Sequence, residues 1–366
     1  MVGQLGIWYA QLLGGDNSIY NIAEYLDIRG DLDVALFEEA LRHTTREVGA
    51  YGLRFRENGR TPQQWIDDPG DWPLPFLDVS SAPDPQAAAE EWMREEISHP
   101  VDLREGPVFS YALFKIADRR HFWYHRVHHV ASDGVGGAII TARLGEVYAA
   151  MLAGSVPADG ALDPVSMLMD DEAAYRASAD FERDREFWLG QLAGLPEVLS
   201  VTGEPVPRMT RMPIRVRRDV DPVRVAGLKD AARQLRTSFA GLMIAAAVAY
   251  VHGISGATDI VIGLPVIGRT GARQRRIPGM TTNMLPIRLR LETGMSVVDL
   301  VRQASKAVRE ALRHQRYRYE DMMRDLRLIN SGTLFGLIVN VMSFDYAIRF
   351  GECEAVAHNL DRKSVV

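Results

Sequence analysis

The chain has 366 residues, of which 47% are hydrophobic and 25% charged, which is ordinary for a globular protein of two domains or lobes. Its net charge of -6 gives no indication of a nucleic-acid or anionic-membrane partner. The single cysteine, Cys353, excludes an internal disulfide framework. Residues 1–11 lack a signal-peptide pattern, and the apolar segment 239–251 is too short to span a bilayer. We therefore expect a cytoplasmic protein that binds neither membrane nor nucleic acid.

The first half of the chain predicts strands that alternate with helices. Aromatic and β-branched runs mark the strands, and apolar residues at helical spacing mark the helices. Asp33 can cap the helix after the first strand, and residues 118–120 join two strands in a hairpin. The predicted strands cover residues 20–28, 52–55, 108–116 and 122–129, and the predicted helices begin at residue 34 or cover 86–97 and 137–152.

The second half repeats this plan after a linker at residues 154–164, which is rich in proline and glycine. A strand and then a helix opened by Asp221 repeat the order seen near the start. The predicted helices cover residues 172–195, 222 onward, 238–252, 297–313 and 319–326, and the predicted strands cover 214–218, 259–265, 284–291 and 337–344. We predict two α/β lobes, an N-terminal lobe at 1–165 and a C-terminal lobe at 166–366.

One short motif carries most of the proton-transfer chemistry. His128 and His129 end a predicted strand, and Asp133 and Gly134 precede a predicted helix. Taken alone, these residues have a plain structural explanation: a hydrogen-bonded core histidine, a helix-capping aspartate and a turn glycine. A metal site is the weaker alternative, because adjacent histidines on a strand point apart and Asp133 alone does not complete a ligand set.

Strand alternation separates the two histidines. His129 shares a face with His125 and Trp123, whereas His128 faces the other side. We therefore expect different roles for the two, with His128 and His125 as packed core residues.

The motif matches the His-His-x-x-x-Asp-Gly hallmark of the condensation domains of nonribosomal peptide synthetases, and the chain resembles this family along its whole length. Further landmarks occur in the family's order: its opening motif, its helix after the catalytic helix, its Ile-Gly-x-Pro…Gly-Arg segment, its Gly-x-x-x-Asn-x-Leu-Pro loop and its His-Gln…Glu motif. These resemble residues 4–12, 170–188, 262–269, 279–286 and 314–320. The resemblance implies two chloramphenicol acetyltransferase-like α/β lobes in a V arrangement with a tunnel between them.

The sequence departs from the family in two places. Gly52 stands where members often have an arginine that pairs with the motif aspartate, so Arg269, or Arg54 in a shifted register, would have to form the ion pair with Asp133. The second departure is the end of the chain, where members continue into further strands and a last helix. We therefore expect an incomplete second lobe.

The resemblance implies peptide-bond formation between two carrier-bound thioesters. His129 would accept the proton of the attacking amine or position that amine, and His128, Asp133 and Gly134 complete the catalytic motif. We expect Asp133 to be structural. Gly134 has two open roles, a turn residue or a backbone N–H that binds the oxyanion.

The same resemblance names tunnel-lining candidates and partners. Ser132, Asn283 and Trp123 are the candidates for the tunnel. No intrinsic cofactor or metal is implied, because phosphopantetheine would arrive on upstream and downstream peptidyl carrier proteins. We expect a monomeric module beside an adenylation domain in an antibiotic or siderophore assembly line. The alternatives are a stand-alone acyltransferase that uses acyl-coenzyme A and a non-catalytic recruiting domain.

Overall fold

The computed structural model describes residues 1–14, 18–57, 62–158, 160–198, 216, 218–329, 332–342 and 348–360. The chain divides into two compact units. The first contains Met1–Glu172, Arg269–Thr281 and Phe344–Lys363, and the second contains Ala173–Gly268, Thr282–Ser343 and Ser364–Val366. The predicted single division after residue 165 differs from these units, because two later segments cluster with the first one.

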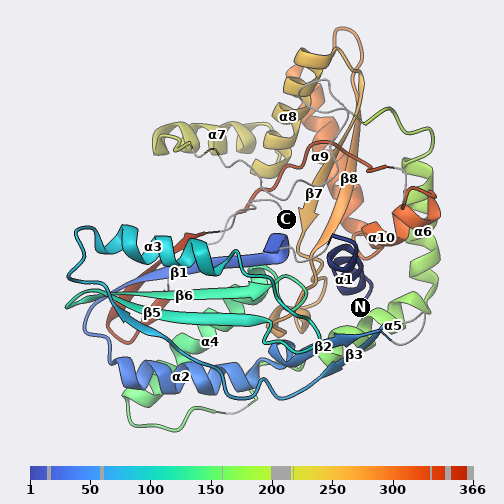
Figure 1. Ribbon diagram of the computed structural model, residues 1–366. Helices are drawn as coiled ribbons and strands as arrows, with labels where there is room; N and C mark the ends of the chain where they lie inside the picture. Colours follow the sequence, from blue (N-terminus) through green and yellow to red (C-terminus); the bar gives the residue numbers. More distant parts are fainter. Residues whose placement is uncertain are drawn as a thin grey trace. The chain divides into compact units, whose positions relative to one another are not determined.

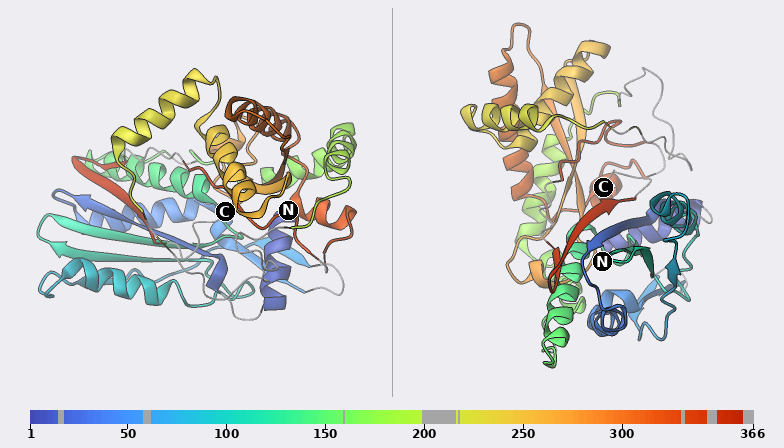
Figure 2. Two further views of the ribbon diagram at one scale, coloured as in Figure 1. Left: turned by 90° about the horizontal axis from the view of Figure 1, so that it is seen from above. Right: turned by 90° about the vertical axis from the view of Figure 1, so that its left-hand side faces the viewer.

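The first unit is built on a six-stranded sheet with the order β4-β5-β6-β1-β10-β9 (Figure 1). Only β4 and β5 are parallel, and β5 and β6 form the predicted hairpin. Strand β10, from near the end of the chain, pairs antiparallel with β1 and lies beside it in Figure 2. The strands are β1 (Asn21–Arg29), β4 (Phe76–Asp78), β5 (Phe109–Ala117), β6 (Arg120–His128), β9 (Ile348–Phe350) and β10 (Cys353–Asn359).

Helices cover both faces of this sheet. Helix α3 (Pro85–Glu96) lies on one face, and α2 (Val34–Glu47) and α4 (Gly134–Leu152) lie on the other (Figure 1). Side chains alternate along β6, so Phe122 belongs to the core on the α3 side and Trp123 to the core on the opposite side. Asp33, Asp84 and Asp133 cap these three helices, as the backbone N–H groups at their first turns require.

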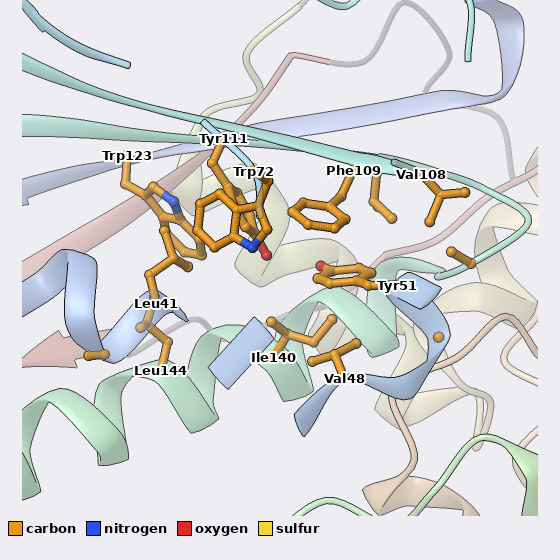
Figure 3. Close-up of a cluster of buried hydrophobic side chains, with 14 of the residues drawn as sticks. Leu41, Val48, Tyr51, Trp72, Val108, Phe109, Tyr111, Trp123, Ile140 and Leu144 are labelled. Atoms are coloured by element: carbon orange, nitrogen blue, oxygen red, sulfur yellow. The ribbon is translucent and has the colours of Figure 1, made fainter. Parts of the chain in front are cut away.

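Helix α4 is the core helix of the first unit. Its length and composition alone would let it cross a bilayer. Within the unit, Ile140 and Leu144 are fully buried and lie against the same cluster as Leu41 of α2 and Trp123 of β6 (Figure 3). The helix is therefore apolar because it is packed inside the protein.

The first unit also contains α1 (Val2–Gly14) and a small hairpin of β2 (Leu53–Arg56) and β3 (Gln63–Ile66). The division between the units falls within helix α5 (Ser166–Arg176), after Glu172. The short 3-10 helices are η1 (Ser18–Tyr20), η2 (Gly49–Gly52) and η3 (Gln274–Arg276).

The second unit packs helices on an antiparallel pair, β7 (Asp259–Val266) and β8 (Asn283–Arg290). Its helices are α6 (Ala179–Gln191), α7 (Pro222–Gln234), α8 (Phe239–Ser255), α9 (Val297–Arg313) and α10 (Tyr319–Asp325). Helix α9 has the predicted bounds and buries Leu300, Val301 and Ala304 on one face.

Two predicted elements differ from the structure. The single helix at 172–195 is two helices, α5 and α6, with Ser178 as the N-cap residue of the second. In the described part of 337–344 there is only an isolated bridge from Ile338 to Gly263. The strand predicted at 214–218 lies largely outside the described residues, and β9 and β10 were not predicted.

Gly52 cannot hold any side chain in this fold. A Cβ atom at this position would lie 1.8 Å from the carbonyl oxygen of Asp67, whose N–H donates to the carbonyl of Gly52 over 2.8 Å. Because both atoms belong to the backbone, neither can move aside without breaking this contact between η2 and the end of β3. An arginine at residue 52 is therefore sterically excluded.

We predict that Gly52→Ala destabilises the first unit by about 1–3 kcal/mol, the range typical of an overpacked site. Gly49→Ala, in the same short helix, is the matched control, because its Cβ would meet only Val165 Cγ1 at 3.8 Å, an ordinary contact. Urea denaturation of both variants measures the difference. Equal stability of the two would contradict this account of Gly52.

Candidate active site

His129 follows directly after β6 and is fixed through both its backbone and its ring. Its backbone N–H donates to the carbonyl of Tyr20 over 2.7 Å, and its Nδ1 lies 3.1 Å from the carbonyl oxygen of Ser132. Since a carbonyl can only accept, Nδ1 carries the proton and Nε2 of the neutral ring holds a lone pair. The geometry therefore prepares Nε2 as a proton acceptor.

The loop that follows is held from helix α1. Gln4 is fully buried, and its Nε2 donates to the carbonyl of Val130 over 2.8 Å. The Oε1 of Gln4 accepts from Gln64 Nε2 at 2.9 Å. Gln4, in the opening motif of the chain, thus positions the backbone between the histidines and helix α4.

Asp133 is a structural residue, as predicted. It caps α4 by accepting from the N–H of Gly136 at 2.8 Å, and it also accepts from the N–H of Thr281 at 2.9 Å. Burial would raise the pKa of this carboxyl, but Arg269 and these N–H donors outweigh it and hold the pKa below its usual value. A carboxylate so fully engaged does not carry protons.

Arg269 is the ion-pair partner of Asp133, which confirms the first of the two predicted alternatives. Its Nη1 lies 3.0 Å from both carboxylate oxygens, and its Nη2 donates to the carbonyl of Gly279 at 2.7 Å. Arg54, the second alternative, instead donates to the carbonyl of Leu53 at 2.9 Å. The alternative was wrong because the Arg54 side chain turns back on its own strand.

The other two histidines of β6 are neutral core residues. Burial lowers the pKa of both His125 and His128 to about 3. His125 Nε2 is hydrogen-bonded to the Tyr51 hydroxyl at 2.8 Å, and His128 Nδ1 accepts from the N–H of Val130 at 3.3 Å. His128 therefore cannot exchange protons near neutral pH, and within the motif its ring supports the loop.

The structure gives different positions to the remaining candidates in the first unit. Trp123 is fully buried in the hydrophobic cluster of Figure 3. Its ring also stacks on His125, so its predicted tunnel position is wrong. Ser132 is also fully buried, and its contribution is the carbonyl that fixes His129. Gly134 is the first residue of α4 and is exposed, so it lies in the helix rather than in a separate turn.

Asn283, in the second unit, uses its whole amide to hold a loop. Its Nδ2 donates to the carbonyls of Gln315 and Tyr317 at 2.9 and 2.8 Å, and its Oδ1 accepts from the N–H groups of Met284 and Tyr319 at 2.9 and 3.0 Å. Four hydrogen bonds saturate the side chain. The predicted tunnel contact is therefore replaced by a structural role.

Glu24 is a further candidate that the sequence reasoning missed. It lies on β1, on the face that carries Leu26 and Ile28 into the core, and burial raises the pKa of its carboxyl from 4.5 to about 7. The signal was present in the sequence, since Glu24 is a charged residue at an inward position of an alternating strand.

Residues 2–364 match the family model described as a condensation domain. A dimodular nonribosomal peptide synthase of Bacillus subtilis (strain 168) is 41% identical over 98% of this chain, which spans 15% of that protein. An isonitrile lipopeptide synthase of Streptomyces coeruleorubidus is 39% identical over 98% of this chain, which spans 25% of that protein. The chain thus corresponds to a minor part of the length of these relatives.

Solved structures give the same family. A mutant starter condensation domain of rhizomide synthetase, in complex with C8-CoA, matches with a TM-score of 0.91 and 38% identity over 98% of this chain and 82% of its own. The first condensation domain of the CDA synthetase matches with a TM-score of 0.88 and 33% identity, over 98% of this chain and 83% of its own. The predicted α/β fold class is confirmed by these matches.

We predict that the Asp133–Arg269 pair is strongly coupled. Asp133→Ala and Arg269→Met should each cost about 3–5 kcal/mol of unfolding free energy, because each leaves a buried partner charge uncompensated. The double variant should cost less than the sum of the two single variants by about 1 kcal/mol or more. The control is Asp118→Ala, which removes an exposed ion pair with Lys115 and should change stability by less than about 0.5 kcal/mol. Additive single effects in urea denaturation would contradict a direct pair.

A second prediction concerns Glu24 and pH. The pKa of Glu24 is raised in the folded state, so the folded protein holds this proton more tightly than the unfolded chain does. The resulting stabilisation is fully present below about pH 4.5 and is lost as the pH rises to about 7. Glu24→Gln cannot titrate, so the stability of this variant relative to wild type should increase between pH 5 and pH 8. Melting temperatures at several pH values measure this, with the exposed Glu91→Gln as control. A pH-independent difference would show that Glu24 titrates normally.

Proposed function

The chain belongs to the condensation-domain family of the nonribosomal peptide synthetases, and we propose that it joins a carrier-bound acyl or peptidyl donor to a carrier-bound aminoacyl acceptor. Members of this family are acyltransferases that form amide bonds. The observation that carries the proposal for this chain is the Ser132 carbonyl bound to His129 Nδ1, because it leaves Nε2 as the basic nitrogen.

The reaction needs one proton transfer in each direction. The acceptor amine attacks the donor thioester carbon, and His129 Nε2 accepts the proton that the amine loses. The tetrahedral intermediate then expels the thiolate, which takes the proton from His129 as the carbon–sulfur bond breaks. We assign the oxyanion to the N–H of Gly134, since it belongs to the first turn of α4, where backbone N–H groups favour negative charge.

Positioning contributes as much to this scheme as basicity does. Amines attack thioesters readily, and holding two reactants in place can replace a large part of the barrier. The buried Asp133, which caps α4, and Gln4, which fixes Val130, both restrain the loop that carries His129 and Ser132. We therefore assign positioning roles to Asp133, Arg269 and Gln4.

The partners follow from the relatives. We propose that carrier proteins bring both substrates on phosphopantetheine arms, that an adenylation domain acts in the same assembly line, and that the site of action is the cytoplasm. Support comes from relatives that include the dimodular nonribosomal peptide synthase of Bacillus subtilis (strain 168) and the enterobactin synthase component F of Escherichia coli (strain K12), the latter at 26% identity. A related starter domain has been solved with both C8-CoA and Leu-SNAC, which provides surrogate donor and acceptor probes.

The test is amide formation between an acyl-carrier donor and an aminoacyl-carrier acceptor, followed by intact-mass spectrometry. His129→Ala should lower the rate by about 10²–10⁴-fold, the usual contribution of general acid–base catalysis. His99→Ala, at an exposed histidine, is the control and should leave the rate unchanged. Product from acyl-coenzyme A but not from acyl carriers would favour a stand-alone acyltransferase. No product from folded wild type with either donor would favour a recruiting role.

A further inference from the structure

We propose that Glu24 selects donor acyl groups that carry a hydroxyl or amino group far from the thioester, by forming a hydrogen bond with that group. This inference rests on the proposed condensation function, because it concerns the donor of that reaction. It assigns a substrate class to the first unit: long donors with a distal hydrogen-bond donor.

The position of Glu24 connects it to the catalytic motif. Glu24 is paired across β1 and β6 with His125, and Asn21 is paired with His128, next to His129. The two pairs are three residue steps apart along the strand, so Glu24 lies on the order of 10 Å along β1 from the motif. An acyl chain of about eight carbons spans such a distance.

The carboxyl of Glu24 faces the start of the catalytic helix. A Cβ atom built on Gly137 of α4 would lie 3.9 Å from Glu24 Oε1, and apart from the adjoining residues of α4 no other atom of the described chain would lie within 4 Å of that Cβ. The missing side chain at Gly137 therefore leaves space beside the carboxyl. Glu24 keeps some exposed surface, through which a ligand would reach the carboxyl.

The Glu24 carboxyl has no hydrogen-bond partner within the described part of the chain. Its cross-strand neighbour on β10, Asn359, is exposed, and two other nearby donors are committed elsewhere. The N–H of Gly137 donates to the carbonyl of Asp133 over 2.9 Å. The hydroxyl of Tyr51 and Nε2 of His125 are hydrogen-bonded to each other at 2.8 Å. His125 and Tyr51 are the titratable groups beside Glu24, and burial keeps both neutral. A desolvated carboxyl without a protein donor favours a ligand that brings one.

The choice of a hydroxyl or an amine follows from the charge balance. Around Glu24 there is no cation among the neighbours named above, so an anionic acyl terminus would be repelled and an alkyl terminus would leave the carboxyl unsatisfied. A hydroxyl can donate to the carboxylate, and an ammonium adds charge attraction to its hydrogen bond. The test distinguishes the hydroxyl from the ammonium group by using one acyl donor of each kind.

The experiment compares carrier-bound octanoyl, 8-hydroxyoctanoyl and 8-aminooctanoyl donors with one aminoacyl acceptor, by intact-mass spectrometry. Wild type should prefer each polar donor over octanoyl by about tenfold or more in kcat/KM, the effect of one charge-assisted hydrogen bond. Glu24→Leu should remove or reverse this preference. Glu24→Gln should retain a preference for the hydroxyl donor and lose most of that for the amino donor.

The ratio of two donors on one variant is unaffected by partial unfolding, so a purely structural role of Glu24 would leave this ratio unchanged. The exposed Glu91→Gln variant should keep the wild-type ratios. Equal ratios in wild type and Glu24→Leu overturn the inference while leaving condensation intact. If folded wild type makes no amide from any of the three donors, the condensation function itself fails, and the inference fails with it.

Discussion

The buried carboxylate of Asp133 is the interaction on which the candidate active site depends. It receives donors from the first turn of α4, from Arg269 and from Thr281, so one side chain joins the start of α4 to both ends of a loop that is far away in sequence. Arg269 extends the connection to the carbonyl of Gly279. This explains why residues 269–281 cluster with the first unit although the strands on both sides of this loop, β7 and β8, belong to the second. The charge is tolerated in the interior because every part of it is hydrogen-bonded.

A short series of contacts connects Asp133 to the ring of His129. The cap fixes the start of α4, the hydroxyl of Ser132 donates to the carbonyl of the capping Asp133 at 3.3 Å, and the Ser132 carbonyl fixes the ring of His129. The two other histidines of β6 stay neutral because burial disfavours the charged ring, so they cannot compete for the proton. The surroundings of the three histidines, and not their residue type, thus decide which of them can accept the proton.

The sequence predicted local elements well and long-range contacts poorly. Periodicity and capping residues identified α2, the β5–β6 hairpin and α9, because these depend on neighbouring residues. Strand β10 was missed because its place beside β1 is set by partners over 300 residues away, and its seven residues carry little pattern of their own. The burial of Trp123 and the hydrogen bonds of Asn283 could not be predicted for the same reason, since a motif does not show which atoms its side chains meet. The Asp133–Arg269 pair was predicted only as one of two alternatives, which geometry had to decide.

Several buried or half-buried carboxylates of the first unit have a charged or hydrogen-bonding partner, and Glu24 is an exception. Asp27 is matched by Arg120 and Arg29, Glu96 by Arg126 and Tyr124, and Asp133 by Arg269. Glu24 is a desolvated carboxyl without a hydrogen-bond partner among the described residues, and it lies beside the catalytic helix. A leucine would suit its position on the inward face of β1 better, as Leu26 and Ile28 show on the same strand. Proteins tolerate such local costs mainly at functional positions, where the missing partner is supplied by a ligand. The unmatched carboxyl is therefore the observation from which we infer the class of donor.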